Sequence, residues 1–145
     1  MSYGLYVVTS KSGERLNGQI ANTVFQISSD PYIVGICLNK NNLTREFVDA
    51  SKVFAVSVLP LTTPLDFIGH FGFKSGRDIN KFAEVPYKTA VTGAPLITEH
   101  TLGFFEAEVV NQVDVATHTL FIGKVINAEV YSDDEPMTYA QYHLI

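Results

Sequence analysis

The chain has 145 residues, a formal net charge of −5 at pH 7, 46% hydrophobic residues and 17% charged residues. This length predicts a single domain, 1–145, with a sizeable core, and the acidic balance without a basic run excludes an electrostatic nucleic-acid surface. Apolar runs fall well short of the roughly 20 residues that cross a bilayer. No signal-peptide pattern opens the chain and a lone Cys37 excludes a disulfide framework, so we expect a soluble cytoplasmic protein without membrane contact.

Apolar and β-branched runs bounded by Gly, Pro, Asn and Ser predict strands. In chain order these are 5–10, 19–28, 33–38, 53–59, a further β segment at 94–97, and a long pair at 102–115 and 118–131. Turn residues at 11–14 and 17–18 connect the first two strands, and 114–117 joins the long pair. In that pair Glu106 and Glu108 alternate with apolar residues, so we expect both carboxylates on a wet face.

The first predicted helix covers 44–51, because Phe47 and Val48 follow Thr44 at helical spacing. A few short helices among many short strands predict a mainly β fold, a closed or nearly closed antiparallel barrel with two or three short helices.

A second helix is predicted to start with Thr63 as its N-cap, Pro64 at the first helical position and Asp66 at the positive end of the dipole. After it, 71–84 is expected to be a loop containing one helical turn at 79–82.

The clearest candidate site lies where the strand 33–38 leads into the first helix. A helix N-terminus offers free backbone N–H groups and a partial positive charge, which suit a phosphate. The side chains that could add donors there are Asn39, Lys40, Asn41, Asn42 and Thr44. An ordinary polar turn with an Asn cap explains the same residues.

A second polar cluster, Asn22, Thr23 and Gln26, interrupts the strand 19–28, where Asn is disfavoured. Its donors could contact the edge of a heterocycle, although an edge strand with solvated side chains is the alternative. Two such clusters on adjoining elements suggest one elongated ligand with a hydrogen-bonding ring at one end and an anion at the other.

The segment 71–77 is the third candidate. Its basic and hydroxyl side chains could hold phosphate or ribityl oxygens, and its aromatic rings could wall a planar group. The residues concerned are Phe71, Phe73, Lys74, Ser75 and Arg77. The alternative is a basic surface loop whose glycines permit tight turns.

His118 follows a predicted turn and could overhang a barrel mouth, where a solvated loop histidine is the simpler explanation. No pair among the four histidines has metal-ligand spacing, so no metal site is expected. A Gly-x-Gly-x-x-Gly motif is absent, so no Rossmann nicotinamide domain is encoded.

The ordered set of motifs resembles the flavin reductase-like, FMN-binding split-barrel family, nearest to flavoredoxins and the flavin domains of high-molecular-weight rubredoxins. The matching segments are 17–18, 21–26, 39–44, 71–77, 81–82, 93–95, His118, 121–125 and 137–143. They extend over essentially the whole chain.

The resemblance implies a homodimer of antiparallel, Greek-key split β-barrels, each subunit holding one FMN. It implies that the isoalloxazine edge is held by one segment, Asn22, Thr23, Val24, Phe25 and Gln26. It also implies that residues 40–44 hold the phosphate with help from 74–77. His118 would lie near a nicotinamide that stacks on the flavin.

The leading hypothesis is an oxidoreductase, with FMN as cofactor and NAD(P)H as co-substrate. The chain shows no Cys-x-x-Cys pair, unlike the rubredoxin relatives, so a separate electron acceptor is expected: a rubredoxin-like or other redox protein, or free flavin. Two alternatives stay open. One is a flavoredoxin-type electron-transfer protein without direct NAD(P)H oxidation, and the other is a flavin-free binding protein on the same barrel.

Overall fold

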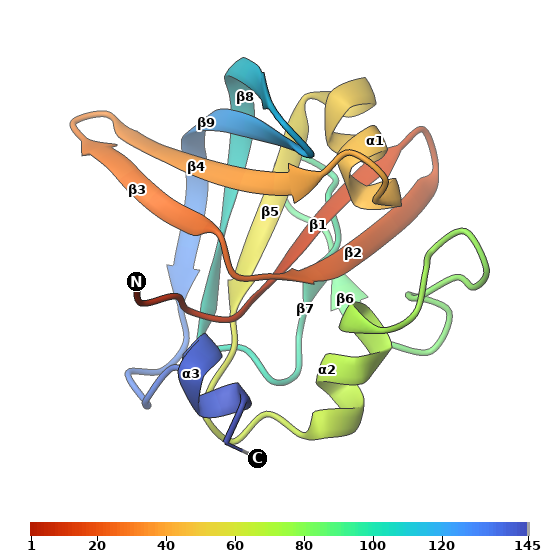
Figure 1. Cartoon of the computed structure of the whole chain (residues 1–145), viewed down its shortest axis with the longest axis vertical. Helices are drawn as coiled ribbons and strands as arrows, with labels where there is room; N and C mark the ends of the chain where they lie inside the picture. Colours follow the sequence, from red (N-terminus) through yellow and green to blue (C-terminus); the bar gives the residue numbers. More distant parts are fainter. Residues whose placement is uncertain (145) are drawn as a thin grey trace.

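The computed structural model describes residues 1–144, in which the β-branched and aromatic runs form a seven-stranded antiparallel sheet (Figure 1). The strands of this sheet are β1 (Tyr6–Ser12), β2 (Arg15–Ala21), β3 (Val24–Ser29), β4 (Tyr32–Asn39), β5 (Val53–Val58), β8 (Gly103–Val115) and β9 (His118–Val130). The remaining elements are α1 (Leu43–Ser51), α2 (Leu65–Gly72), α3 (Tyr139–Tyr142) and a separate pair, β6 (Tyr87–Lys88) with β7 (Leu96–Ile97).

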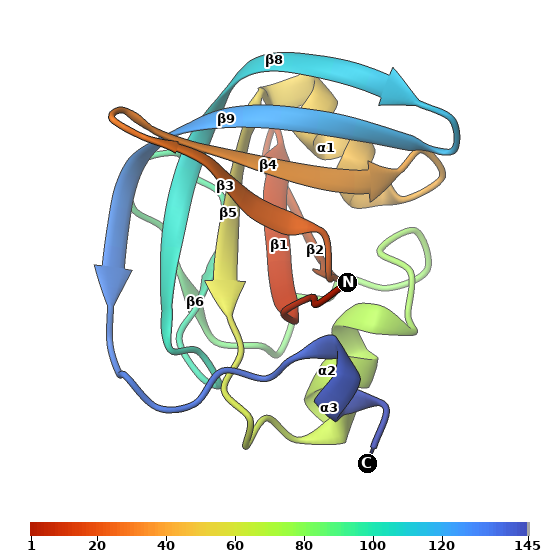
Figure 2. The same cartoon turned by 60° about the vertical axis from the view of Figure 1, so that its left-hand side comes forward.

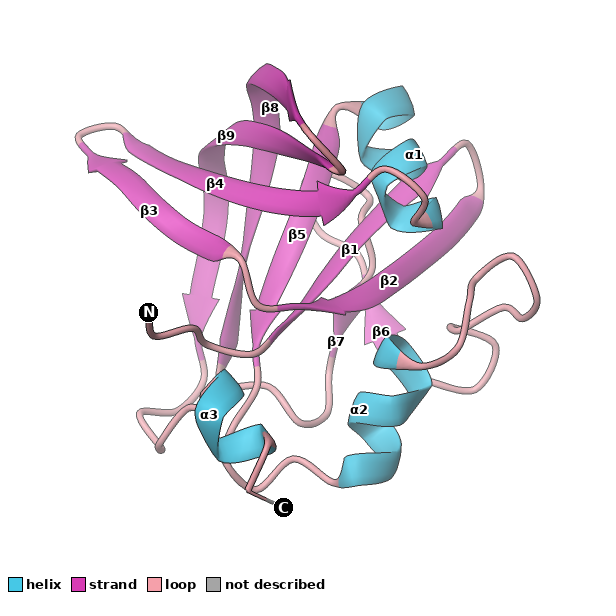
Figure 3. Ribbon diagram, in the orientation of Figure 1, coloured by secondary structure: helices cyan, strands magenta, loops and turns pink. Residues whose placement is uncertain are grey.

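The strand order β2-β1-β5-β8-β9-β4-β3 makes this sheet a barrel with one gap. β2 and β3 lie at opposite ends of that order, yet only Asn22 and Thr23 separate them in sequence. The sheet must therefore curl until its two edges approach each other, as Figure 2 shows, and no β ladder within residues 1–144 joins them. The predicted mainly β, antiparallel split barrel with short helices is confirmed. Figure 3 shows α2 and α3 beside the barrel, whereas α1 contributes Val48 to its interior core.

Neighbouring residues of β1 belong to two different cores because successive side chains point to opposite faces of a strand. Val8 packs in the barrel interior with Ile36 and Phe54, and all three are fully buried. Val7 packs on the other face, under α2, with Ile68. Full burial of such a side chain is worth about 1.5–3 kcal/mol. The double burial explains the continuous apolar pattern of β1 and fixes α2 against the outside of the barrel.

The prediction of one strand over 19–28 was wrong, because β2 ends at Ala21 and β3 begins at Val24. The chain crosses from one sheet edge to the other between them, and the Thr23 hydroxyl donates to Asn22 Oδ1 at 3.1 Å in that crossing. The predicted turn at 17–18 was also wrong, since both residues lie within β2 and pair with β1.

The predicted N-cap of α2 was wrong as well. Thr63 donates its hydroxyl to the Pro60 carbonyl at 2.6 Å, so that oxygen is engaged outside the helix. Pro64 is the N-cap rather than the first helical residue, and α2 starts without a side-chain cap.

Two further expectations need correction. Phe71 and Gly72 are the last residues of α2, and 79–82 forms turns rather than a helical turn. Glu106 is fully buried instead of wet, because loop residues before β7 fold over it; Glu108 is exposed as expected.

None of the helices within residues 1–144 has the length and hydropathy needed to cross a membrane. In the same part of the chain, no three His, Cys, Asp or Glu side chains gather closely enough to hold a metal ion.

Candidate functional site

A cleft runs along β2 between the β4–α1 turn and the C-terminal end of α2. Its first part, the lysine chamber, has a volume of about 290 Å³ and is lined by residues 17, 19, 20, 41–44, 71–76 and 81. Its second part, the histidine chamber, has a volume of about 250 Å³ and is lined by residues 5, 19–23, 37, 39, 42, 118 and 139. The chambers share Gln19, Ile20 and Asn42. Together they reach the roughly 300–1,000 Å³ typical of small-molecule sites.

The N-terminus of α1 faces the lysine chamber. Asn42 is its N-cap and makes no side-chain capping bond, while Asn39 Oδ1 accepts from the Asn41 backbone N–H at 2.9 Å. Asn42 and Thr44 both line the chamber. The open helix start therefore presents backbone donors and the positive end of the helix dipole to whatever occupies the cleft.

Asn17 and Gln19 on β2 carry unpaired acceptors in this cleft. The two buried side-chain oxygens that lack a hydrogen-bond partner within residues 1–144 are Asn17 Oδ1 and Gln19 Oε1. Asn17 is only 3% exposed, and its Nδ2 donates to Thr44 Oγ1 at 2.9 Å. Buried polar groups are nearly always paired, so these two oxygens are acceptors that a ligand with donor groups would satisfy.

Lys81 is the one charged side chain buried in the lysine chamber, at 3% exposure. Its Nζ donates to the carbonyls of Gly18, at 2.8 Å, and Phe71, at 2.9 Å. Burial lowers the pKa of Lys81 to about 8. The ammonium thus bridges β2 and the end of α2, and it places a positive charge beside the cleft.

The histidine chamber gathers Asn22, Thr23, Asn39 and His118 around the gap in the barrel. His118 pairs with Asn39 across β9 and β4, and its Nδ1 lies 2.8 Å from the Thr117 hydroxyl. Cys37 also lines this chamber, and burial raises the pKa of its thiol, which keeps the sulfur protonated. Asn22, Thr23 and Asn39 therefore offer uncharged hydrogen-bonding groups in this chamber.

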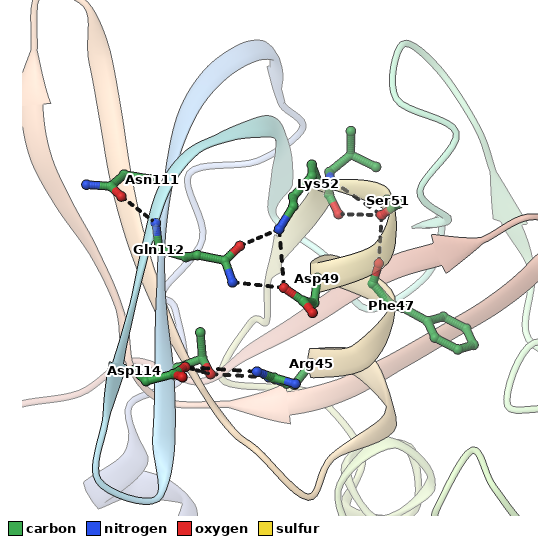
Figure 4. Close-up of polar contacts among 10 residues, drawn as sticks. Arg45, Phe47, Asp49, Ser51, Lys52, Asn111, Gln112 and Asp114 are labelled. Atoms are coloured by element: carbon green, nitrogen blue, oxygen red, sulfur yellow. Dashed lines mark hydrogen bonds and ion pairs between the residues drawn. The ribbon is translucent and has the colours of Figure 1, made fainter.

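A polar network fixes the β8–β9 hairpin over α1 and so holds the start of β9 near the cleft (Figure 4). Arg45 donates to Thr119 Oγ1 at 3.2 Å and lies 3.9 Å from Asp114. Gln112 donates to Asp49 at 2.8 Å, and the hydrogen bonds from Gln112 and Lys52 lower the pKa of Asp49. Because His118 immediately precedes Thr119, this network sets its distance from the N-terminus of α1.

The structure brings most of the predicted site residues to this cleft. Those lining one or both chambers are Asn22, Thr23, Asn39, Asn41, Asn42, Thr44, Phe71, Phe73, Lys74, Ser75 and His118. Phe71 is fully enclosed in an aromatic cluster with Phe67 and Phe82, whereas Phe73 is 78% exposed at the rim.

Other predicted site residues lie outside it. Val24, Phe25 and Gln26 line a separate apolar groove on β3. Lys40 and Arg77 line neither chamber. Arg77 pairs with Glu46 and donates to the Asn41 carbonyl at 3.2 Å, at the start of α1.

Sequence reasoning missed Asn17, Gln19, Lys81, Cys37 and Tyr139 as cleft residues. Asn17 carried a signal that was misinterpreted, because an Asn-Gly pair is typical of turns. Lys81 gave no local signal beyond its place in the matching segment 81–82, since a loop lysine is exposed by default.

Comparisons with known proteins identify the family to which the chain is similar. The family model described as "Flavin reductase like domain" matches residues 1–144. The ferric-chelate reductase (NAD(P)H) of Archaeoglobus fulgidus is 54% identical over 145 residues, covering 100% of this chain and 86% of that protein. The high molecular weight rubredoxin of Moorella thermoacetica is 51% identical over 145 residues, and the chain spans only 63% of its length.

Among solved structures, the NADH:FAD oxidoreductase SgcE6 of Streptomyces globisporus C-1027 superposes with a TM-score of 0.88. It is 28% identical in sequence, and the match covers 97% of this chain and 83% of that chain.

Proposed function

Because the chain belongs to the flavin reductase-like domain family, we propose that it is an FMN-binding oxidoreductase that takes hydride from NAD(P)H and passes electrons to a separate acceptor. The family model and the ferric-chelate reductase relative confirm the family resemblance inferred from the sequence motifs and the oxidoreductase class. FMN, the nicotinamide co-substrate and the acceptor are the proposed details.

The pair of orphaned oxygens on β2 carries the proposal. Asn17 Oδ1 and Gln19 Oε1 need donors, which the hydroxyls of a ribityl chain and the ring N–H of a flavin supply. At the lysine chamber, the α1 N-terminus and Lys81 would hold the phosphate. In the histidine chamber Asn22 and Thr23 would orient the ring edge. The residues present therefore fit an FMN laid along β2.

FMN, when bound, supplies the hydride and electron chemistry, and the protein supplies position and field. Fixed polar groups around the ring would stabilise the charge that develops on reduction. His118, at the mouth of the histidine chamber, would orient the nicotinamide or hold a proton beside the ring.

The names of two relatives support the nicotinamide: one is a ferric-chelate reductase (NAD(P)H), the other an NADH:FAD oxidoreductase. The rubredoxin relative supports a rubredoxin-like acceptor, and a ferric chelate is a second acceptor class to test.

The proposal is tested on purified protein by its visible spectrum, by uptake of added FMN or FAD, and by anaerobic mixing with NADH and NADPH. We expect a yellow protein whose flavin bleaches nearly stoichiometrically. His118→Ala should slow bleaching by roughly tenfold or more, as loss of a positioned proton-transfer group does, with FMN affinity unchanged. Protein that takes up no flavin would refute the proposal. Flavin that only dithionite reduces would favour the flavoredoxin-type alternative.

We also propose that the protein is a homodimer that covers the β3 groove. This groove has a volume of about 380 Å³ and is mostly apolar; Tyr32, which is 60% exposed, and Phe25, 43% exposed, line it. β3 is an edge strand of the sheet, and exposed apolar edges favour association.

Sedimentation at micromolar concentration should give twice the 16.0 kDa chain mass. Tyr32→Asp should shift the equilibrium toward the monomer by placing a charge in the buried patch. Tyr87→Asp, at a 43% exposed tyrosine outside the groove, is the matched control and should stay dimeric. A wild-type monomer would contradict the proposal.

A further inference from the structure

Lys81 is a buried ammonium without a counter-ion. In the described part of the chain no carboxylate lies within 4.0 Å of its Nζ; the ion pairs there involve Arg45, Lys52, Arg77 and Lys88. Its two partners are the uncharged carbonyls of Gly18 and Phe71. A buried charge is costly unless it is paired, and an ammonium has three hydrogens to donate. One hydrogen and a full charge are therefore left uncompensated.

The ionisable groups around Lys81 do not supply the negative charge that would compensate its ammonium. The lysine chamber contains one other ionisable side chain, Lys74, which is also cationic and is exposed. On α2, His70 Nε2 lies 2.7 Å from the Lys81 carbonyl rather than its ammonium. On α1, Glu46 is paired with Arg77 outside the chamber.

The cleft itself is where the missing anion would fit. Lys81 lines it together with Thr44 at the open start of α1. An anion placed here would meet a buried ammonium and a helix N-terminus at once, both in a setting of low dielectric.

On the basis of the proposed function, we propose that Lys81 is the residue that makes this site require a phosphorylated flavin, and that it couples binding of the phosphate to its own protonation. The uncharged tail of riboflavin would leave the ammonium uncompensated, whereas the phosphate of FMN would satisfy it.

This role of Lys81 predicts that FMN affinity falls as the pH rises above the pKa of its ammonium. With the pKa near 8 in the free protein, Lys81 is charged at neutral pH, and a bound phosphate raises its pKa further. Below pH 8 this residue adds no pH dependence to FMN affinity. Above pH 8 affinity should fall by up to about tenfold per pH unit, with uptake of nearly one proton per FMN. Riboflavin affinity should not show this dependence.

The experiment measures FMN and riboflavin affinities by fluorescence quenching from pH 7 to 9.5, and proton uptake by calorimetry in two buffers of different ionisation enthalpy. Wild-type protein should prefer FMN and take up protons above pH 8. Lys81→Met keeps the length of the side chain but removes the charge, so it should lower the preference for FMN by about tenfold or more and abolish the proton uptake. Lys124→Met, at an exposed lysine of β9 that lines neither chamber, should change the preference less than about threefold.

Equal affinity of wild-type protein for FMN and riboflavin, or FMN binding without proton uptake at pH 9, would overturn the role of Lys81 and leave the flavin proposal intact. Both measurements use wild-type protein, so they decide the question even if Lys81→Met does not fold. A wild-type protein that binds no flavin at all would instead refute the proposed function.

Discussion

Glu106→Gln should lower the free energy of unfolding by about 3 kcal/mol, because it replaces a fully buried carboxylate whose two oxygens accept four hydrogen bonds. Oε1 accepts from the Thr92 backbone N–H at 2.9 Å and from its hydroxyl at 2.6 Å. Oε2 accepts from the Val91 N–H at 3.1 Å and from Asn127 Nδ2 at 2.8 Å. A glutamine has a single oxygen, so its NH₂ group must face one of these pairs of donors.

The same site predicts how stability depends on pH. Burial by itself raises the pKa of Glu106, but the hydrogen bonds from Thr92, Asn127 and Val91 outweigh it, so the net pKa is lowered. A carboxylate with a lowered pKa contributes stability above its unfolded value of about 4.3, and this contribution is lost as pH falls through the folded pKa. Urea unfolding should therefore show wild-type stability declining more steeply below about pH 4 than that of Glu106→Gln.

Glu108→Gln is the matched control, since Glu108 lies two residues further along β8 and is exposed. It should change stability by less than about 0.5 kcal/mol. If both variants unfold at the wild-type urea midpoint, the four hydrogen bonds at Glu106 do not stabilise the fold as proposed.

The strands were predictable because their signal is local. Runs such as Val53–Val58 and the long pair β8 and β9 contain the β-branched residues and alternation that strands favour. The break between β2 and β3 at Asn22 and Thr23 was not predictable, because the strand-like alternation of side chains continues on both sides of it. The gap in the barrel arises only when the seven strands close into a barrel. Burial of Glu106 was hidden for the same reason, since its donors at Val91 and Thr92 belong to a distant loop.

The candidate site likewise has one part with a local sequence signal and another that depends on long-range contacts. The open start of α1 was predictable from an Asn-rich strand-to-helix junction, and that junction does line the cleft with Thr44. Asn17 and Lys81 belong to the matching segments 17–18 and 81–82, but their roles in the cleft could not be assigned. Their partners lie 27 residues away, at Thr44, and 63 residues away, at Gly18. Residues that act through long-range contacts carry no local pattern, whereas helix ends do.

Gly76→Ala should weaken FMN binding by about 100-fold, or roughly 2.7 kcal/mol, while the protein still folds. A Cβ on Gly76 would overlap Asn17 Oδ1 and would lie 2.6 Å from Cγ and 2.8 Å from Nδ2 of the same side chain, which is closer than real Cβ contacts allow. The Asn17 side chain is short, buried and bonded to Thr44, so it cannot move aside without breaking that bond. The added methyl would therefore displace the Asn17 amide, whose unpaired oxygen lies against Gly76, a residue that lines the same chamber. Fluorescence quenching of FMN measures the loss, and a thermal melt checks the fold.

Gly72→Ala separates this effect from a general crowding of the cleft. Gly72 lines the same chamber, but a Cβ there would meet Ile20 Cγ1 at 3.2 Å, a contact that a flexible apolar side chain can relieve by a small shift. Its effect on FMN affinity should stay below about fivefold, or roughly 1 kcal/mol. If both glycine variants bind FMN as the wild-type protein does, Asn17 is not part of the flavin site, because only Gly76→Ala disturbs its amide. A selective loss in Gly76→Ala ties the orphaned oxygen on β2 to the ligand.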